Sequence, residues 1–357
     1  MMCILIAMSI DWSTNKNYYE NIYQAIGKTP LVKLNKIKEN FGISANIYGK
    51  CDFLNPSGSL KDRVYYRMIT EAIKDKSLKP GMEIIEVSTG NAGIACTWIG
   101  TILGFKVTIV MPEGMSSERK KIIRALGGNI IETPGAESDV DISYDLVKKM
   151  VKENPEKYWF PDQYTNKYAI KAHHDTTGAE IWEQLHGEMD AFIITQGTGG
   201  TLTGAGSYFK KMNKNVKLYA VEPAEAPLLS KRKWGSHRIE GIGDGFVPRN
   251  LDLSIIDGIV TVSSEESVHW AKQLIYHEKL LVGISSGANL AAAVKVSKKH
   301  PEFKNLVIML NDSASRYFST ELFDVKKEVK IPEREHPMDE YTKEQLNKYQ
   351  DRWEIIE

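Results

Sequence analysis

The sequence predicts an α/β fold of two subdomains, built on parallel β-sheets flanked by helices. The chain has 357 residues, a length that suits two subdomains around a substantial core. Short apolar runs alternate with amphipathic segments, which is the order of strands and helices in parallel sheets with right-handed crossovers. Glycine- and serine-rich loops follow several predicted strands and lead into predicted helices.

Proline and glycine divide the N-terminal half into elements. A Gly-x-Thr-Pro turn at residues 27–30 and a Lys-Pro-Gly stop at residues 79–81 each end a predicted helix. Around these breaks, apolar runs alternate with amphipathic ones. We therefore expect strands at 31–34, 46–50, 82–87, 105–110 and 129–132, and helices at 18–26, 60–79, 94–103, 116–126 and 139–154.

The C-terminal half continues this alternation. Past residue 323 the chain becomes charged, and residues 338–357 predict a terminal helix that packs at a subunit contact. The apolar and amphipathic runs before it predict strands at 191–194, 218–221, 280–284 and 305–310, and helices at 265–278 and 285–300.

Composition excludes several classes of function. The 46 basic residues balance the 46 acidic ones, so nucleic acids and anionic membranes are poor partners. Cys3, Cys51 and Cys96 are odd in number and lack metal-site spacing, which predicts reduced thiols in a cytoplasmic protein. Residues 1–10 are apolar but lack the basic region and cleavage site of a signal peptide. No run is long enough to cross a membrane.

Lys61 stands where a turn passes into a helix. Residues 55–59, Asn-Pro-Ser-Gly-Ser, have turn chemistry, and Leu60 opens a helical run with apolar groups on one side. A cation in the first helical turn opposes the helix dipole. Lys61 is therefore either an exposed residue near a cap or an amine of lowered pKa that acts as a Schiff-base nucleophile.

Two glycine-rich loops predict anion binding. Residues 88–93, Ser-Thr-Gly-Asn-Ala-Gly, form either a routine turn or a nest of backbone N–H groups for a substrate carboxylate. Residues 197–201, Gly-Thr-Gly-Gly-Thr, have a dinucleotide fingerprint as their rival interpretation, and Glu222 lies where that rival requires an acid. The hydroxyls of Thr198 and Thr201, however, suit a terminal phosphate monoester better than a bridging pyrophosphate.

A metal site is not expected. His173 and His174 are adjacent, and neighbours on a helix point about 100° apart, given its 3.6 residues per turn. No cysteine or carboxylate falls at a spacing that would complete a zinc site with them.

Residues 55–63, Asn-Pro-Ser-Gly-Ser-Leu-Lys-Asp-Arg, resemble the lysine motif of the pyridoxal-phosphate enzymes of fold type II. Within them the chain is most similar to the cysteine synthase and cystathionine β-synthase family, over about residues 19–323. The resemblance implies a two-domain fold like that of the tryptophan synthase β subunit, pyridoxal 5'-phosphate as cofactor, and a homodimer.

The resemblance also implies roles for individual residues. Lys61 would hold the cofactor, and Asn91 would touch its phenolic oxygen. Ser285 would hydrogen-bond the pyridine nitrogen, and a hydroxyl there suits β-elimination better than decarboxylation or transamination. The implied cofactor-binding residues are Lys61, Asn91, Gly197, Thr198, Gly199, Gly200, Thr201 and Ser285. The implied substrate-binding residues are Ser88, Thr89, Gly90, Asn91, Gln163, Tyr164 and Gly241.

Asp244 departs from the family pattern. The loop Gly-Ile-Gly at residues 241–243 faces the substrate in the family and is commonly followed by Ala in cysteine synthases and Tyr in cystathionine β-synthases. An aspartate there is either a turn residue or a catalytic carboxylate that orients or deprotonates a water or thiol. Tyr164 favours the cystathionine β-synthases, whereas residues 177–182 resemble the cysteine synthases.

Four parts of the chain are expected. Residues 1–18 form an N-terminal extension, 19–50 with 151–330 a large cofactor-binding domain, 51–150 a small mobile substrate domain, and 331–357 a C-terminal tail.

Three functions remain open. The first is β-replacement on serine, O-acetylserine or O-phosphoserine with sulfide or a thiol, giving cysteine or cystathionine. The second is a cysteine lyase or hydrolase that releases sulfide, with Asp244 activating water. The third is a non-catalytic regulatory protein that keeps the cofactor. In each case the expected partners are small molecules and a second copy of the chain.

Overall fold

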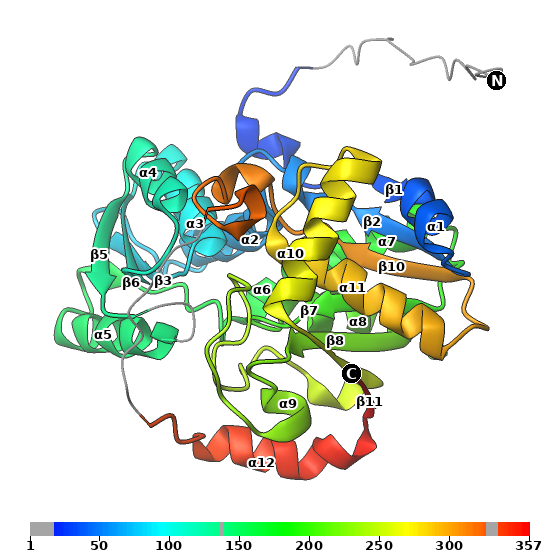
Figure 1. Ribbon diagram of the computed structural model, residues 1–357. Coiled ribbons are helices and arrows are strands. Elements are labelled where there is room, and N and C mark those ends of the chain that lie inside the picture. Colours follow the sequence, from blue (N-terminus) through cyan, green and yellow to red (C-terminus); the bar gives the residue numbers. More distant parts are fainter. Residues whose placement is uncertain (1–17, 136–138, 326–334) are drawn as a thin grey trace.

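The computed structural model describes residues 18–135, 139–325 and 335–357, which form two β-sheets covered by helices (Figure 1). A seven-stranded sheet has the order β1-β2-β10-β7-β8-β9-β11, and a four-stranded sheet has the order β5-β4-β3-β6. Neighbouring strands are parallel, apart from β1, which runs antiparallel to β2. The predicted α/β class with parallel sheets is confirmed.

Most strands lie where the sequence predicts them, but residues 280–284 do not form one. Lys279 takes a left-handed φ of 60°, which ends the preceding helical segment, and Val282 makes only an isolated bridge to Ser313. The strands are β1 Leu31–Lys33, β2 Asn46–Lys50, β3 Glu83–Val87, β4 Lys106–Pro112, β5 Asn129–Thr133, β6 Tyr158–Trp159, β7 Ala191–Thr195, β8 Lys217–Pro223, β9 Gly258–Val262, β10 Asn305–Met309 and β11 Glu354–Ile356.

Most of the predicted helices are present, but the helices at residues 35–41, 167–172, 179–184, 200–212 and 228–231 were not predicted. The helix predicted over 18–26 is instead one 3-10 turn, Ile22–Ala25, because the chain becomes extended at Ile26 to reach β1. The α-helices are α1 Asn35–Phe41, α2 Lys61–Lys74, α3 Asn91–Ile102, α4 Ser117–Ala125, α5 Val140–Glu153, α6 Lys167–Ala172, α7 Ala179–Gln184, α8 Gly200–Met212, α9 Leu228–Lys231, α10 Ser264–Gln273, α11 Ile284–Lys299 and α12 Glu340–Tyr349.

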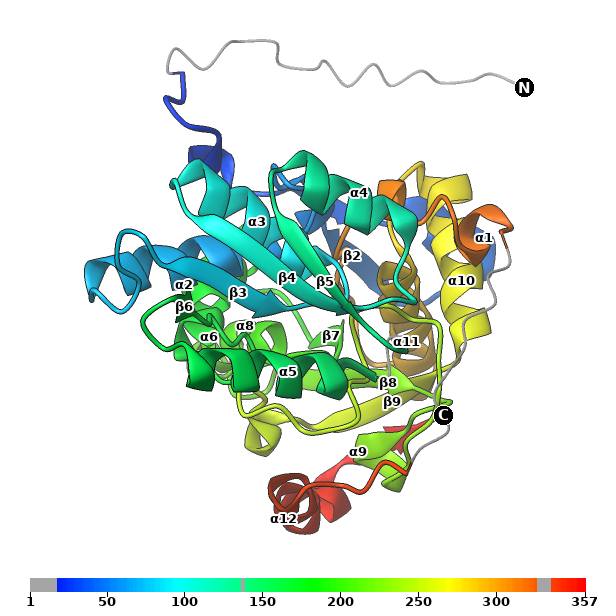
Figure 2. The same ribbon diagram turned by 90° about the vertical axis from the view of Figure 1, so that its left-hand side faces the viewer.

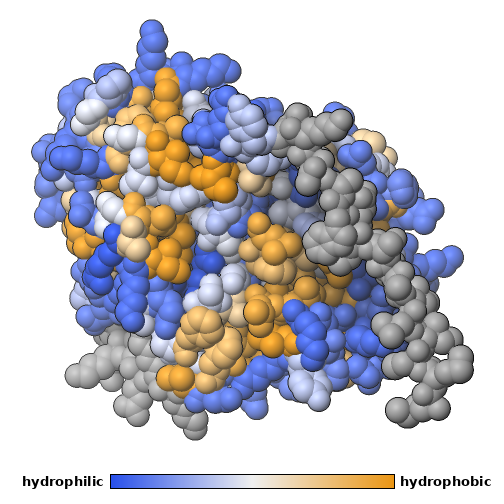
Figure 3. Space-filling view, turned by 90° about the horizontal axis from the view of Figure 1, so that it is seen from above, coloured by the Kyte–Doolittle hydropathy of each residue, from blue (hydrophilic) through white to orange (hydrophobic). Residues whose placement is uncertain are grey.

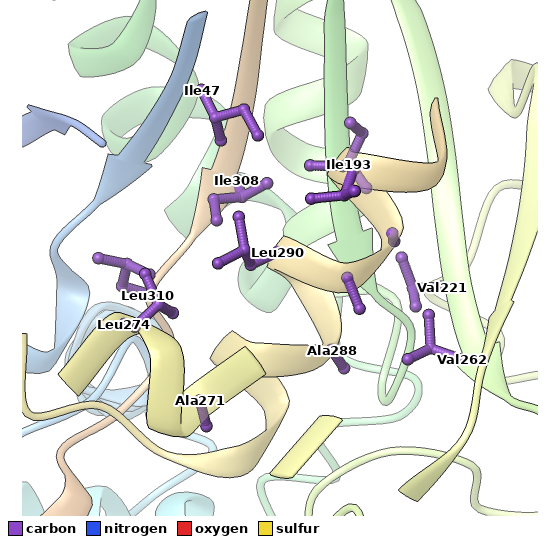
Figure 4. Close-up of a cluster of buried hydrophobic side chains, with 14 of the residues drawn as sticks. Ile47, Ile193, Val221, Val262, Ala271, Leu274, Ala288, Leu290, Ile308 and Leu310 are labelled. Atoms are coloured by element: carbon purple, nitrogen blue, oxygen red, sulfur yellow. The ribbon is translucent and has the colours of Figure 1, made fainter. Parts of the chain in front are cut away.

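The large sheet is buried on both faces. Along β10, Leu306 and Ile308 point into one apolar cluster, and Val307 and Met309 point into the other, as the alternation of a strand requires. The first cluster contains α10 and α11, and Figure 4 shows Leu290 of α11 directed toward the strands. This packing fixes the start of α11, where Ser285 lies, against the sheet.

The small sheet carries the loop at residues 88–93. Figure 2 shows α3 and α4 on one side of it and α5 on the other. Its edge strand β6 lies past residue 150, yet it pairs with β3. The proposed domain boundaries at residues 50 and 150 stay a prediction.

The C-terminal segment packs against the chain's own large sheet. Leu346 and Trp353 are buried in the second apolar cluster, and β11 pairs with β9. The backbone N–H of Val247 donates to Thr342 Oγ1 at 2.9 Å, which ties α12 to the loop at residues 232–250. The sequence therefore predicted the helix correctly, but too long and without the strand that returns it to the sheet.

Residues 1–17, most of the predicted N-terminal extension, lie outside the described part of the chain. Among the described helices, none has both the length and the apolar composition that a membrane span needs.

Candidate active site

A cavity opens between the two sheets, at the carboxyl ends of β3, β7 and β10. Ligands of open α/β sheets bind at this edge. The empty volume of the cavity, with its open mouth, is about 800 Å³. Its lining includes every predicted site residue except Gly200, namely Lys61, Ser88, Thr89, Gly90, Asn91, Gln163, Tyr164, Gly197, Thr198, Gly199, Thr201, Gly241, Asp244 and Ser285.

Lys61 is the first residue of α2 and points between two of the predicted loops. Its Nζ donates to Gln163 Oε1 at 2.8 Å and to Thr198 Oγ1 at 3.3 Å. Burial lowers the pKa of Lys61 to about 8, although the carboxyls of Asp244 and Glu86 oppose this shift. Burial therefore makes a neutral amine available as a base near pH 8.

A buried ion-pair cluster holds the helix that carries Lys61. Arg63, 1% exposed, contacts Asp52 through Nε at 2.8 Å and Glu180 through Nη1 at 2.6 Å. The Nζ of Lys50, at the end of β2, lies 2.7 Å from Glu180 Oε2. Because Asp52 and Glu180 belong to the large-sheet side, the cluster fixes the start of α2 relative to that sheet.

We expect Arg63→Met to lower the free energy of unfolding by about 3–5 kcal/mol, because it leaves the fully buried carboxylate of Asp52 without its partner. Urea unfolding monitored by circular dichroism measures this. Arg67→Met, one turn later on the same helix with a 32% exposed side chain, is the control and should cost less than about 1 kcal/mol. Equal losses in both variants would show that the cluster is not the anchor.

The loop at residues 88–93 is braced from within and from outside. Ser88 Oγ accepts from the N–H groups of Gly90 at 2.9 Å and Gly93 at 2.7 Å, so this hydroxyl shapes the loop. Asn91 Nδ2 donates to Asp312 Oδ2 at 2.7 Å. The Oδ1 atom of Asn91 is buried and has no hydrogen-bond partner in the described protein, which is what a group reserved for a ligand shows.

The loop at residues 197–201 forms a cradle at the start of α8. A Cβ atom on Gly197 would lie 2.4 Å from the carbonyl oxygen of Gly241, and Gly199 has a φ of 80°, so both positions require glycine. Thr201 Oγ1 lies 3.1 Å from Nε2 of the buried His173, whose pKa burial lowers to about 3. His173 is therefore a neutral support for Thr201.

Ser285 lies in the first turn of α11 and lines the cavity. Its Oγ accepts from Asn311 Nδ2 at 3.0 Å, which leaves the hydroxyl proton to be donated. In the described part of the chain, no three His, Cys, Asp or Glu side chains are grouped so as to hold a metal ion.

Asp244 is 6% exposed and faces the cavity from between Gly243 and Gly245, whose φ angles are 73° and 81°. Burial raises the pKa of Asp244 to about 6, against the opposing effects of the Lys61 ammonium and a hydrogen bond from Tyr164. A simple turn aspartate would lie in solvent, so its position favours the interpretation as a catalytic carboxylate.

Sequence reasoning missed Arg119, which belongs to a buried group of side chains behind the substrate loop. Arg119 of α4 is 1% exposed, forms an ion pair with Glu240, and lies 4.8 Å from the ring centroid of Tyr317. Tyr317 Oη donates to Asp312 Oδ2 at 2.8 Å, the same oxygen that receives Asn91. The charged residues around Arg119 have the sequence pattern of an exposed helix. Only the contacts of Arg119 with Glu240 and Tyr317 show that its side chain is buried.

Residues 22–312 match the family described as "Pyridoxal-phosphate dependent enzyme". The chain belongs to this family. Cysteine synthase A of Escherichia coli (strain K12) is 41% identical over 314 residues, which cover 85% of this chain and 95% of that relative. Cystathionine β-synthase of Apis mellifera is 43% identical over 305 residues, but they cover 84% of this chain and only 60% of that longer protein.

Solved structures of fold type II resemble the chain throughout. Cysteine synthase from Entamoeba histolytica has a TM-score of 0.83 and 36% identity, covering 96% of this chain and 98% of its own. A hydrogen sulfide-producing enzyme from Fusobacterium nucleatum has a TM-score of 0.80 and 36% identity, covering 84% and 100%. The predicted family, fold type and enzyme class are confirmed.

The cavity of this family member fits pyridoxal phosphate. The loop at residues 197–201 lines the cavity at the N-terminus of α8, an end that favours a phosphate, and its close packing against Gly241 and Leu251 requires glycine at 197 and 199. The Thr198 and Thr201 hydroxyls, the Ser285 hydroxyl and the Lys61 amine line the same space. These donors and acceptors complement the phosphate, the ring nitrogen and the aldehyde carbon of the cofactor.

Proposed function

We propose that the protein catalyses β-replacement on serine, O-acetylserine or O-phosphoserine, with sulfide or a thiol as nucleophile and cysteine or cystathionine as product. The observation that carries the proposal is the position of Lys61 Nζ, within hydrogen-bond distance of Gln163 and Thr198. Gln163 belongs to the proposed binding site of the substrate carboxylate, and Thr198 belongs to the proposed phosphate-binding loop. The relatives named cysteine synthase and cystathionine β-synthase support the same reaction.

Pyridoxal phosphate, when bound, supplies an electron sink for the α-carbon of the substrate. The loop at the start of α3 holds the substrate carboxylate through Ser88, Thr89, Gly90 and Asn91, and Gln163 assists from the segment between β6 and α6. Lys61 removes the α-proton and returns it after the nucleophile has added to the β-carbon. Its lowered pKa supports this role, because a neutral amine is available near pH 8.

Cysteine lyase or hydrolase activity is the second candidate, and the buried carboxyl of Asp244 favours it. In this reaction sulfide leaves the β-carbon of cysteine, and Asp244 takes the proton of an incoming water. The hydrogen sulfide-producing neighbour adds support. Membership in an enzyme family favours turnover over the non-catalytic alternative.

The test is the absorption spectrum of the cofactor-loaded protein, titrated in turn with L-serine, O-acetyl-L-serine, O-phospho-L-serine and L-cysteine. We expect at least one of the three serine compounds to change the spectrum, and sulfide or homocysteine to restore it with formation of product. A change with L-cysteine alone, with steady release of sulfide, would instead select the second candidate. An unchanged spectrum with all four compounds would refute both.

We further propose a homodimer in the cytoplasm. Large apolar side chains such as Tyr18, Ile22, Phe41 and Leu281 are exposed, and Figure 3 shows apolar patches on the face seen from above. Cys51 and Cys96 are buried free thiols, as suits a reducing compartment. We also propose that residues 88–150 close over the cavity during turnover and exclude water.

A further inference from the structure

A second, smaller cavity adjoins the main one. Its empty volume, counted in the same way, is about 270 Å³. Gln196 and Asp244 line both cavities, so they form the wall between them. We call the smaller cavity the side chamber; its other walls include Glu222, Ala226, Leu228, Trp234 and Phe246.

The walls of the side chamber are held in place by specific contacts. Glu222, at the end of β8, accepts from the backbone N–H groups of Leu229 at 2.7 Å and Ser230 at 2.9 Å, which fixes α9 beneath the chamber. Trp234 stacks on His336 with ring centroids 3.7 Å apart. The chamber is therefore built into the fold, between β8, α9 and the loop at residues 232–250.

One wall group has no hydrogen-bond partner among the residues that the structure describes. The indole Nε1 of Trp234 is buried and makes no hydrogen bond within the described residues. Buried donors in folded proteins are nearly always paired with protein or with a bound small molecule. This N–H group is suited to a ligand that offers a lone pair.

The charges around the side chamber select against anions. The carboxyl groups of Glu222 and Asp244 are both buried. Lys233, the one cation of the described lining, belongs to an exposed residue. Ala226, Leu228, Trp234 and Phe246 supply apolar surface. A small neutral molecule with a lone pair and a proton, such as water or hydrogen sulfide, fits this lining better than acetate, phosphate or an amino-acid zwitterion.

We propose that the side chamber is the binding site of the small neutral nucleophile, hydrogen sulfide or water, which passes the Gln196–Asp244 wall to reach the substrate in the main cavity. The inference rests on the proposed function, because it assigns the second substrate of that reaction. In this arrangement the two substrates bind in separate places. The amino acid enters through the open mouth of the main cavity, and the nucleophile binds in the side chamber, on the other side of Asp244.

Filling the chamber tests the proposal. In the cofactor-loaded enzyme we would make Ala226→Leu and, from another wall, Leu228→Phe, two buried positions that line only the side chamber. Ala224→Leu, two residues earlier at an exposed position, is the matched control. Two steps are measured: the spectral change with the amino acid alone, and its reversal by sulfide in stopped flow.

We expect Ala226→Leu and Leu228→Phe to raise the apparent KM for sulfide at least tenfold, while the concentration of amino acid that gives half the spectral change stays within twofold. The control should behave as wild type in both steps. An unchanged apparent KM for sulfide in both filled variants would overturn the proposal, as would equal losses in the two steps. If the wild-type enzyme itself shows no spectral change with any of the four amino acids, the proposed function has failed, and the chamber assignment with it.

Discussion

Lys61→Ala is expected to lower turnover in β-replacement by roughly 10³-fold or more, because no other described amine lines the cavity to exchange the α-proton. Arg119, the other cation of that lining, cannot deprotonate in a protein. The same change removes the covalent attachment point of the cofactor, so the absorption spectrum of the holoenzyme should change even without substrate.

The measurement is cysteine formation from O-acetylserine and sulfide, together with the absorption spectrum of the cofactor-loaded variant. Lys74→Ala lies at the other end of the same helix with a 79% exposed side chain and should leave both unchanged. The fold should survive, because burial disfavours the charged form of Lys61 and the smaller alanine removes that penalty. Retained activity, or an unchanged spectrum in a folded variant, would refute the assignment of Lys61.

Asp244→Asn is expected to lower the release of sulfide from cysteine by about 100-fold if water is the nucleophile, since water is a weak acid that needs a base. Replacement by sulfide should fall less than about tenfold, because hydrogen sulfide is a much stronger acid than water and loses its proton with less help from a base. The ratio of the two activities in the variant therefore distinguishes a hydrolase from a synthase. Asp252→Asn, on an exposed turn, is the control.

The pH dependence of the hydrolytic rate tests the role of Asp244 independently. A base acts only when deprotonated, and burial raises the pKa of Asp244 from its ordinary value near 4 to about 6. The hydrolytic rate should therefore rise as the pH increases through about 6, in addition to any rise near pH 8 that the deprotonation of Lys61 causes. Asp244→Asn should remove this inflection. An identical pH profile in wild type and variant would show that Asp244 is not the base.

Local patterns determined the fold class and most of the site. Strand and helix periodicity is a property of neighbouring residues, so the order of the elements could be predicted from the chain alone. The turn before Lys61 and the glycines at 197 and 199 encode backbone conformations that need no distant partner. This is why the sequence placed nearly every predicted binding residue around one cavity.

Contacts between residues far apart in the sequence decided the elements and the site residues that local patterns did not predict. Residues 280–284 have the composition of a strand but find no sheet neighbour. Residues 354–356, predicted as the end of a helix, instead form β11 because β9 is free to pair with them. Arg119 looks like a surface residue until Glu240 and Tyr317, more than 100 residues away, bury it.

Asp244 shows most clearly which properties the sequence determines and which depend on the tertiary structure. Its sequence context could be read as a turn or as a catalytic loop, and the two interpretations differ only in whether its carboxyl lies in solvent. The structure buries it beside Lys61, between the main cavity and the side chamber. Sequence alone determined which groups are present and in what local conformation. Burial, which sets their pKa values and their access to small molecules, depends on segments that only the tertiary structure brings together.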